Sequence, residues 1–359
     1  MDFIKYGYEN MGDSPWKMVL IILFLAIGLV MIIKGGDFFV DAASWIAEKT
    51  GIPKLIIGAT IVSLATTLPE LLVSVFAAIE GVQTGASSAV DMATGNALGS
   101  VVANTGLIMS ISILFMPVEV ERKTFIVKPL ILIASITLLF IFSIDRSLYV
   151  WEAIILLVVL VLFFADNVYE AVREGKKKAS LESAETEVEL EKVEVSSEEK
   201  VSSTKKEIIV NTIKFVIGIA GIVFGAQFLV DNGTALATEL GVPEKIIAIT
   251  IVAIGTSLPE LITTITAIIK KQSDLSVGNV IGANIIDITM ILSICAIVYG
   301  KSLPVFTTTL CYDLPFALGL AVVGTVPTMF TKKLQRWQGI AMLAIYITYL
   351  TLNIVLPLA

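Results

Sequence analysis

The sequence predicts an all-α membrane protein of ten transmembrane helices that form two inverted five-helix repeats. Of its 359 residues, 56% are hydrophobic and only 16% are charged, whereas soluble domains carry about 25% charged residues. Ten apolar segments are long enough to cross the bilayer, for which about 20 residues are needed, and the two halves of the chain share a series of motifs. The expected spans are residues 18–35, 53–80, 90–116, 127–144, 148–168, 208–230, 243–270, 276–299, 309–330 and 335–357.

Basic residues in the loops predict the orientation of these spans. Of 25 Lys and Arg residues, 20 lie on the face that carries the polar segment 170–207, among them Lys128 at the start of the fourth span, and 5 lie on the other face. Because basic loops gather on the cytoplasmic side, we expect segment 170–207 to be a cytoplasmic linker and both termini to be outside. The linker separates a first repeat, 1–169, from a second, 208–359, in a multi-pass protein of the cytoplasmic membrane.

Three blocks of sequence recur in the same order in both halves of the chain. Thr66-Thr-Leu-Pro-Glu70 matches Thr256-Ser-Leu-Pro-Glu260 at an offset of 190 residues. The same offset relates Gly36–Asp41 to Ala226–Asp231, and an offset of 183 relates Gly95-Asn-Ala-Leu-Gly to Gly278-Asn-Val-Ile-Gly. Matching spans are five apart, and because five is odd the second copy enters the membrane from the opposite side. Inverted repeats enclose a central site reached alternately from the two faces, which is typical of secondary transporters.

Two acids are expected inside the membrane. Glu70 and Glu260 each follow a proline directly, and a carboxylate near the bilayer centre costs about 2.5–3.5 kcal/mol on insertion scales. Pro69 and Pro259 cannot donate to the carbonyl four residues earlier, which leaves backbone oxygens free beside the carboxylates. Such an oxygen cage suits Na⁺ or Ca²⁺. The absence of histidine excludes histidine metal sites and proton shuttles.

The third and eighth spans add further polar groups. In the third span these groups recur every four residues, on one face of a helix, as Asn96, Ser100 and Asn104. Their equivalents in the eighth span are Asn279, Ala283 and Asp287. We expect at most three acids at this depth, Glu70, Glu260 and Asp287, and no Lys or Arg to pair with them. A bound cation or a proton must then supply the countercharge.

The blocks that end in Leu-Pro-Glu70 and Leu-Pro-Glu260, each followed by Gly-Asn-x-x-Gly, resemble the alpha repeats of the calcium/cation antiporter superfamily, and prokaryotic sodium/calcium exchangers most closely. The resemblance covers essentially all ten spans. It implies electrogenic exchange of Ca²⁺ for Na⁺ by sliding of two peripheral helices past a rigid core. We expect no enzymatic activity and no cofactor, and the net charge of −7 argues against a nucleic-acid partner. No protein partner is evident from the sequence.

The resemblance also implies ion ligands, position by position. Glu70 and Glu260 would bind both Ca²⁺ and Na⁺, and the carbonyls of Thr66 and Thr256 would complete the Ca²⁺ site. Na⁺ would be bound by Ser100 and Ser257 with the carbonyls of Ser63 and Ala253, while Asn104 and Asp287 would flank the centre. Asn104 replaces an acid of potassium-dependent relatives, which disfavours K⁺ coupling.

Two residues depart from the family pattern. Thr67 stands where serine is usual and Ala283 where serine is common, and both changes would fall on the outermost Na⁺ site. Sodium stoichiometry and coupling are therefore open, and an antiporter of Ca²⁺ and H⁺, or of another divalent cation such as Mg²⁺ or Mn²⁺, stays an alternative. A passive cation channel would not need two inverted copies. An intramembrane aspartyl protease would need two facing aspartates, so both are remoter.

Overall fold

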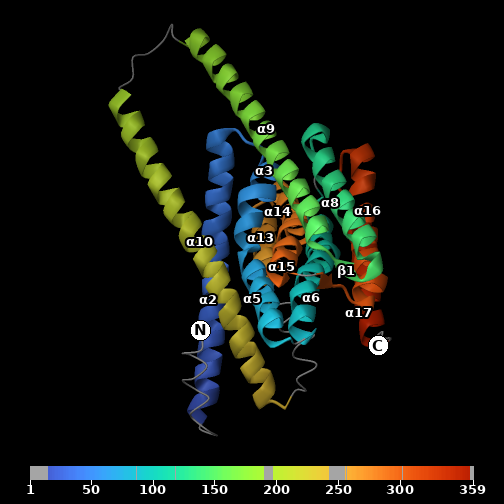
Figure 1. The fold of residues 1–359 in the computed structure, drawn as a ribbon. Coiled ribbons are helices and arrows are strands. Elements are labelled where there is room, and N and C mark those ends of the chain that lie inside the picture. The colour runs from blue at the N-terminus through green and yellow to red at the C-terminus, as the bar shows by residue number, and fades with distance from the viewer. Residues whose placement is uncertain are drawn as a thin grey trace.

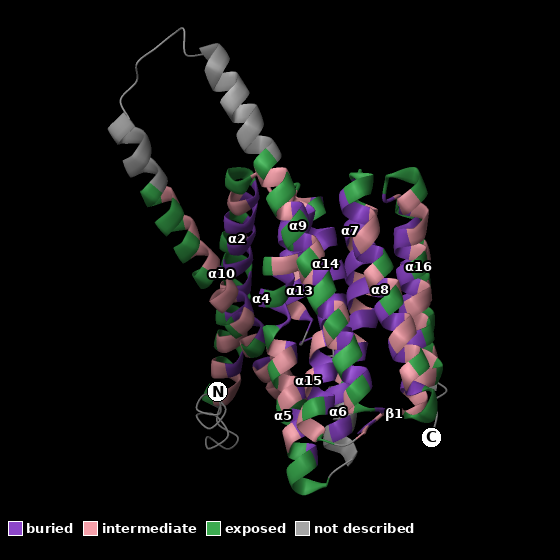
Figure 2. Ribbon diagram, turned by 45° about the horizontal axis from the view of Figure 1, so that its top comes forward, coloured by how far each residue is buried: buried purple, intermediate pink, exposed green. Residues whose placement is uncertain are grey.

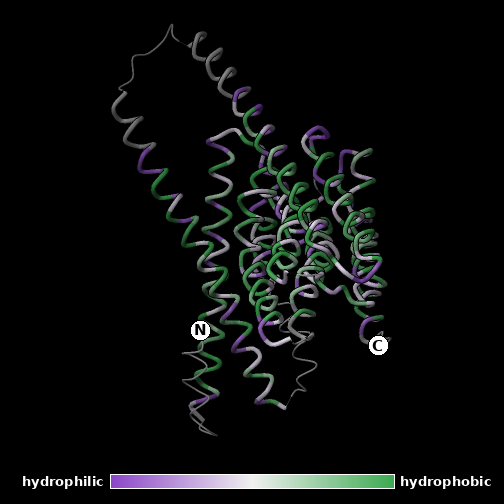
Figure 3. Tube along the Cα trace, in the orientation of Figure 1, coloured by the Kyte–Doolittle hydropathy of each residue, from purple (hydrophilic) through white to green (hydrophobic). Residues whose placement is uncertain are grey.

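The computed structural model describes residues 15–85, 87–117, 119–189, 197–241, 255, 257–300 and 302–355, nearly all of them helical. Figure 1 shows a bundle of roughly antiparallel helices from which α9 and α10 extend at one end. Both ends of the described chain lie toward the opposite end of the bundle. Hydrophobic residues predominate along the helices within the bundle, and hydrophilic ones gather where α9 and α10 leave it (Figure 3).

The elements are written in chain order, with η for a π-helical or 3₁₀ segment. The first half comprises α2 (Pro15–Thr50), α3 (Lys54–Ile57), η1 (Gly58–Val62), α4 (Ser63–Thr66), α5 (Leu68–Thr84), α6 (Ser87–Ala103), η2 (Asn104–Met109), α7 (Ser110–Phe115), α8 (Arg122–Phe142), η3 (Ser143–Asp145), β1 (Ser147–Leu148) and α9 (Val150–Glu189). The second half comprises α10 (Ser197–Glu239), α13 (Leu258–Ile269), α14 (Ser273–Ile286), η5 (Asp287–Ile291), α15 (Leu292–Tyr299), β2 (Leu303–Pro304), η6 (Thr309–Asp313), α16 (Leu314–Thr331) and α17 (Arg336–Val355).

Within the described residues, seven helices are long and apolar enough to cross a membrane. An eighth span is possible if the pair Lys54–Thr66 and Leu68–Thr84 counts as one, although the pair is bent by 44°. Of the expected span 243–270, the structure describes the part around Leu258–Ile269, a short apolar helix. The membrane-spanning character of the fold is therefore established, whereas the count of ten stays a prediction.

Helices α2 and α10 form an antiparallel pair at one side of the bundle (Figure 1). Their two ends are joined by ion pairs, Lys17 with Glu239 and Lys49 with Glu207, the latter at 2.9 Å. Between the ends the backbones approach closely, since a Cβ atom on Gly35 would lie 2.8 Å from the carbonyl carbon of Gly221. Only 22% of the most apolar 18-residue stretch of either helix is buried. Most of this pair of helices therefore faces outward.

Helix α14 lies at the centre of the bundle. In the most apolar 18-residue stretch of the span Ser273–Tyr299, 83% is buried, and the ribbon beside the α14 label in Figure 2 has the colour of buried residues. A Cβ atom on Gly278 would lie 2.2 Å from the Leu55 carbonyl oxygen, and one on Gly282 would lie 2.5 Å from that of Ala59. The two glycines thus let α14 cross α3 and η1 at backbone contact, as expected of a Gly-xxx-Gly spacing.

Two short backbone pairings join loops that are far apart in the sequence. β1, between α8 and α9, pairs antiparallel with β2, which follows α15. An isolated bridge pairs Glu119, before α8, with Lys333, before α17. Because α8 separates Glu119 from β1, the two pairings lie at opposite ends of the bundle.

Candidate cation-binding site

Both Leu-Pro-Glu motifs begin a helix in the interior of the bundle. Thr67 separates α4 from α5, and Ser257 directly precedes α13. In each helix the proline occupies the first turn, where its missing N–H leaves no helical bond unmade. The helices α5 and α13 therefore start next to the motif acids, and Glu70 and Glu260 lie in their first turns. A helix N-terminus carries a partial positive charge that favours a carboxylate.

Glu70 joins hydroxyl groups from both halves of the chain. Its side chain is fully buried, and Oε1 accepts hydrogen bonds from Ser100 Oγ at 2.8 Å and from Ser257 Oγ at 3.2 Å. Ser257 Oγ also lies 3.3 Å from Ser100 Oγ. Two residues predicted as sodium ligands thus meet at the carboxylate predicted to bind the ions. The other carboxylate oxygen, Oε2, has no hydrogen-bond partner among the described residues.

Glu260 lies in a different polar environment. It is fully buried, and neither carboxylate oxygen accepts a hydrogen bond of good geometry from a described residue. The Thr66 hydroxyl approaches Glu260, but its hydrogen bonds run to the Ser63 carbonyl and to Asn279 Oδ1, each at 3.3 Å. A buried carboxylate without partners is costly, and a cation at this position would remove that cost.

Asn104 and Asp287 occupy matched positions in the two halves. Each is fully buried and begins a π-helical segment, η2 and η5 respectively. Neither side chain has a hydrogen-bond partner among the described residues. Single-turn π-helices are rare and frequently lie at functional sites, and the pair supports the predicted position at the flanks of the site.

The three acids lie close enough for their charges to interact. Glu70 is repelled by both Glu260 and Asp287, and Asp287 by Glu260. In the described part of the chain none of the three forms an ion pair with a basic residue. Nowhere among the described residues do three or more Asp, Glu, Cys or His side chains form a group that could hold a metal ion by itself. An ion here would need hydroxyl and backbone oxygens as well as carboxylates.

Two of the predicted ligand groups, the Thr67 hydroxyl and the Ser63 carbonyl, are hydrogen-bonded to each other. The Thr67 hydroxyl donates to the Ser63 carbonyl at 2.7 Å, and the Thr67 N–H donates to the same oxygen at 3.0 Å. The Ser63 carbonyl is therefore already hydrogen-bonded in the structure. Ala283, at the position where serine is common in the family, is buried and has no polar side-chain atom. Thr256 and Ala253, whose carbonyls were predicted as ligands, lie outside the described residues.

A second layer of amides surrounds the acids. Asn96 Nδ2 donates to Ser74 Oγ at 2.9 Å and to the Glu70 carbonyl at 3.3 Å. Asn284 Nδ2 donates to Thr105 Oγ1 at 2.6 Å, which links α14 to η2. These bonds fix the helices that carry Glu70 and Asn104, and the matched Gly-Asn blocks gave the sequence signal for Asn96.

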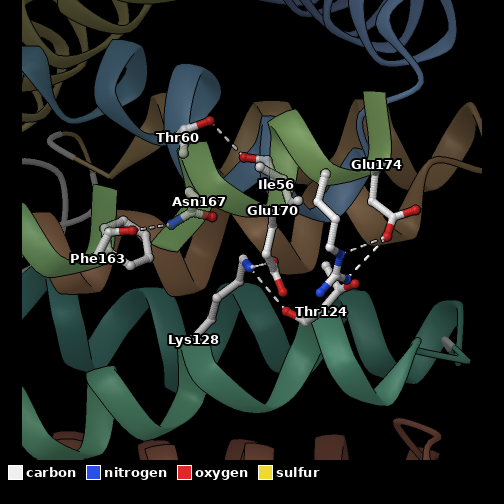
Figure 4. A network of polar contacts seen from close by, with 9 residues as sticks. Ile56, Thr60, Thr124, Lys128, Phe163, Asn167, Glu170 and Glu174 are labelled. Carbon is white, nitrogen blue, oxygen red and sulfur yellow. Dashed lines mark hydrogen bonds and ion pairs between the residues drawn. The ribbon is translucent and has the colours of Figure 1, made fainter. Parts of the chain in front are cut away.

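Lys128 was counted with the basic residues at the start of the fourth span, but it lies inside the bundle. Its side chain is wholly buried in α8 and makes a 2.8 Å ion pair with Glu170 of α9, with a further bond of 3.0 Å to the Thr124 carbonyl (Figure 4). The hydropathy pattern missed this because Lys128 is only six residues from the start of α8. The pair leaves Lys128 committed to Glu170 rather than to the three central acids.

The sequence did not single out Asp313, another acid inside a candidate span. Asp313 ends η6, inside the candidate span Thr309–Thr331, and accepts a hydrogen bond from the Tyr349 hydroxyl of α17 at 2.9 Å. Asp313 lies near one end of this span, whereas the expectation of at most three acids concerned the depth of Glu70, Glu260 and Asp287. Asp313 lies near the start of its apolar segment, where sequence alone does not separate a buried acid from one at the membrane surface.

Relatives of this chain are membrane proteins and exchangers. It is 30% identical over 351 residues to the sodium/calcium exchanger MaX1 of Methanosarcina acetivorans, which covers 91% of this chain and 97% of the relative. It is 32% identical over 287 residues to the inner membrane protein YrbG of Escherichia coli, with 78% and 81% of the two chains covered.

The fold is similar to solved structures of the sodium-calcium exchanger NCX_Mj. One of them, soaked with 10 mM Na⁺ and 10 mM Sr²⁺, has a TM-score of 0.75 and 25% identity over 95% of this chain and all of that chain. The family model described as "Sodium/calcium exchanger protein" matches residues 20–165 and 210–355. These two matched segments correspond to the two halves that carry the repeated Leu-Pro-Glu motifs. This chain belongs to the sodium/calcium exchanger family.

Proposed function

We propose that the protein is a secondary antiporter that exchanges Ca²⁺ for Na⁺ across the cytoplasmic membrane by alternating access. The observation that carries the proposal is the group of buried, mutually repelling acids Glu70, Glu260 and Asp287, which lack a basic partner among the described residues. Buried charges in membrane proteins are paired or bind ions. A relative described as a sodium/calcium exchanger indicates which two ions, Na⁺ and Ca²⁺, such a site would exchange.

The proposed ligands come from both halves of the chain. Glu70 and Glu260 would share a Ca²⁺ ion, whose two charges balance the two carboxylates. Backbone oxygens of Thr66 and Thr256 would complete its shell, as hard cations prefer oxygen ligands. For Na⁺ we propose the hydroxyls of Ser100 and Ser257 with the carbonyls of Ser63 and Ala253, the side chain of Thr67 lying beside them. Asn104 and Asp287 would flank the centre.

Ten spans in two inverted repeats are part of the proposal. Three features of the fold support it: helices begin at matched motifs in α5 and α13, π-helices begin at the matched residues Asn104 and Asp287, and loop pairings lie at opposite ends of the bundle. The first pairing joins the loops after α8 and α15, and the second joins the loops before α8 and after α16. Exchanging the two halves turns one pairing into the other, as an inverted repeat requires.

Transport in proteoliposomes tests the proposal directly. Ca²⁺ uptake is measured while outward gradients of Na⁺, K⁺ and H⁺ are imposed one at a time, and protein-free vesicles give the background. We expect uptake with the Na⁺ gradient and none with K⁺. Uptake that follows the H⁺ gradient alone would replace Na⁺ by protons as the coupling ion. Flux that neither saturates nor shows counterflow would indicate a channel and overturn antiport.

A further inference from the structure

One lysine ties the peripheral helix α2 to the helix that carries Glu260. Lys270 directly follows α13, and its Nζ donates to Asp41 Oδ1 at 2.8 Å and to the Asp37 carbonyl at 2.9 Å. The same Nζ lies 3.3 Å from Asp37 Oδ1. Both acids belong to the C-terminal part of α2, which reaches the end of the bundle where α9 and α10 leave it (Figure 1). We call this end the linker end.

Helix α2 also covers the face of α13 that leads from Glu260 to Lys270. A Cβ atom on Gly36 of α2 would lie 2.7 Å from Thr266 Oγ1 and 3.1 Å from Ile262 Cγ2, so α2 packs directly on α13 here. Ile262, Thr266 and Lys270 are spaced by four residues and therefore share one face of the helix. At the linker end, α2 thus closes the approach to Glu260 along this face.

The matching face of α5 is uncovered. Leu72, Phe76 and Glu80 stand at the repeat offset of 190 from the three residues of the α13 face. Leu72 and Phe76 are 53% and 64% exposed, and Glu80 is exposed as well. Helix α10, the counterpart of α2, therefore leaves this face of α5 open, and the two halves of the chain differ in how far each peripheral helix closes its end of the bundle.

The end away from the linker also lacks matching charges. The two acids of α2 are matched at the offset of 190 by Gln227 and Asp231 of α10, and Gln227 Nε2 donates to Asp231 Oδ1 at 2.8 Å. The lysine is matched by Glu80 of α5. If α10 packed on α5 as α2 packs on α13, Glu80 would approach Asp231, and like charges repel.

We propose that Lys270, Asp37 and Asp41 form a one-sided latch, which holds the linker end of the site closed and has no equivalent at the opposite end. The inference rests on the alternating access of the proposed function, in which the two halves exchange their conformations. In the exchanged state α2 leaves α13 and the latch breaks, and no ion pair between the matched residues replaces it. Partly exposed ion pairs of this kind shift such an equilibrium about two- to fivefold.

Two engineered disulfides measure the two states. Cβ atoms at positions 36 and 266 would lie 3.7 Å apart, within the range of about 3.5–4.5 Å found in disulfides, so Gly36→Cys/Thr266→Cys reports closure at the linker end. The matched pair Ala226→Cys/Phe76→Cys reports closure at the opposite end. Both pairs are made with Cys311 replaced by serine. With an oxidant that acts slowly relative to the exchange of states, the rate at which each disulfide forms in the purified protein measures the population of its state.

Lys270→Met tests the latch. We expect it to speed formation of the opposite-end disulfide about two- to fivefold, because the linker-closed state loses its ion pairs. Asp41→Asn removes a charge from the other helix and should act in the same direction. The charge exchange Lys270→Glu/Asp41→Lys restores an ion pair and should return the rate toward that of the wild type. The matched control is Lys271→Gln at the exposed neighbouring lysine, which should leave the rate unchanged.

The outcomes separate the latch from the function on which it rests. An opposite-end disulfide that forms at the wild-type rate in Lys270→Met, or equally fast in Lys271→Gln and Lys270→Met, overturns the latch. Disulfide formation requires no ion gradient, so the test does not depend on which ions are exchanged. Absence of Na⁺-driven Ca²⁺ uptake by the wild-type protein would instead contradict the proposed function.

Discussion

Glu70 and Glu260 share one sequence motif but differ in their contacts, and both bury a carboxylate completely. In the proposed function a bound cation balances the charge in each case. We expect Glu70→Gln and Glu260→Gln each to lower Na⁺-driven Ca²⁺ uptake at least about a hundredfold, because removal of one partner from a buried charge interaction costs about 3–5 kcal/mol. Uptake of Ca²⁺ into proteoliposomes measures the effect.

A matched control comes from the same helix as Glu70. Glu80 lies further along α5 and is exposed, so Glu80→Gln removes an acid without changing the site and should transport normally. Wild-type flux in either site variant would show that the corresponding carboxylate does not bind the ion.

Asp287 is expected to tolerate neutralisation better than the two glutamates. Its counterpart Asn104 already carries an amide in an equally buried position, so an amide at 287 restores the symmetry of the pair without changing the side-chain shape. Asp287→Asn should lower the rate less than about tenfold, by analogy with a single modest hydrogen-bond change. Complete loss of transport in this variant would mean that Asp287 binds an ion as a carboxylate.

The residue types of the site could be predicted from the sequence, but their contacts could not. The repeated motifs identified Glu70, and the recurrence of polar residues every four positions in the third span identified Ser100, which the structure places in hydrogen-bond contact with Glu70. The family resemblance placed Thr67 at the outermost Na⁺ site, and in the structure its hydroxyl donates to the backbone of its own turn. Threonine hydroxyls commonly bond the carbonyl four residues earlier in helices, and spacing alone does not decide between that bond and an ion.

At the scale of elements, the crossing of α14 with α3 and η1 depends on the absence of side chains. A Cβ atom at Gly278 would lie 2.2 Å from the Leu55 carbonyl oxygen, so the backbones must separate when it is introduced. Overpacking of this kind costs about 1–3 kcal/mol, and we expect Gly278→Ala to lower the melting temperature in detergent, measured by size-exclusion chromatography after heating. Gly319→Ala in α16, where no described atom lies within 4 Å, should leave it unchanged or raise it slightly.

A second prediction about packing concerns the buried ion pair between α8 and α9. Lys128 and Glu170 are both buried, so Lys128→Met or Glu170→Leu alone leaves an unpaired charge and should destabilise by about 3–5 kcal/mol. The double variant Lys128→Met/Glu170→Leu removes both charges and should recover most of that loss in the same heating assay.

The exposed pair of Lys333 and Glu119 is the control for this cycle, with an expected coupling of about 0–1 kcal/mol. Equal coupling in both pairs would show that burial does not strengthen the contact of Lys128 with Glu170.

Hydropathy predicted where apolar helices lie but not how they continue. The first span was expected at 18–35, whereas α2 runs from Pro15 to Thr50, and its added part carries Asp37 and Asp41, which pair with Lys270 of the other half at 3.3 and 2.8 Å. The second span was expected as one segment, 53–80, and is instead bent by 44°. Proline signalled that break, since it removes a helical hydrogen bond, but long-range ion pairs leave no trace in a hydropathy window.

At the scale of the whole molecule, the two loop pairings define opposite ends of the bundle. Helix α9 runs from β1 to the linker, so the loop between α8 and α9 lies at the end away from the linker. The loop before α8 lies at the linker end, since α8 and α9 are consecutive antiparallel helices (Figure 1). The bias of basic residues toward the linker end predicts that this end is cytoplasmic.

Cysteine labelling tests that orientation on the intact protein. In a background with the exposed Cys311 replaced by serine, the buried Cys295 stays silent, and single cysteines are introduced as Lys123→Cys at the linker end and Arg146→Cys at the opposite end, both exposed positions. A membrane-impermeant maleimide on whole cells should label Arg146→Cys at once and Lys123→Cys only after permeabilisation, because the basic linker end stays in the cytoplasm. The reverse pattern would place the linker outside, and Ca²⁺ bound from the linker end would then come from the external side.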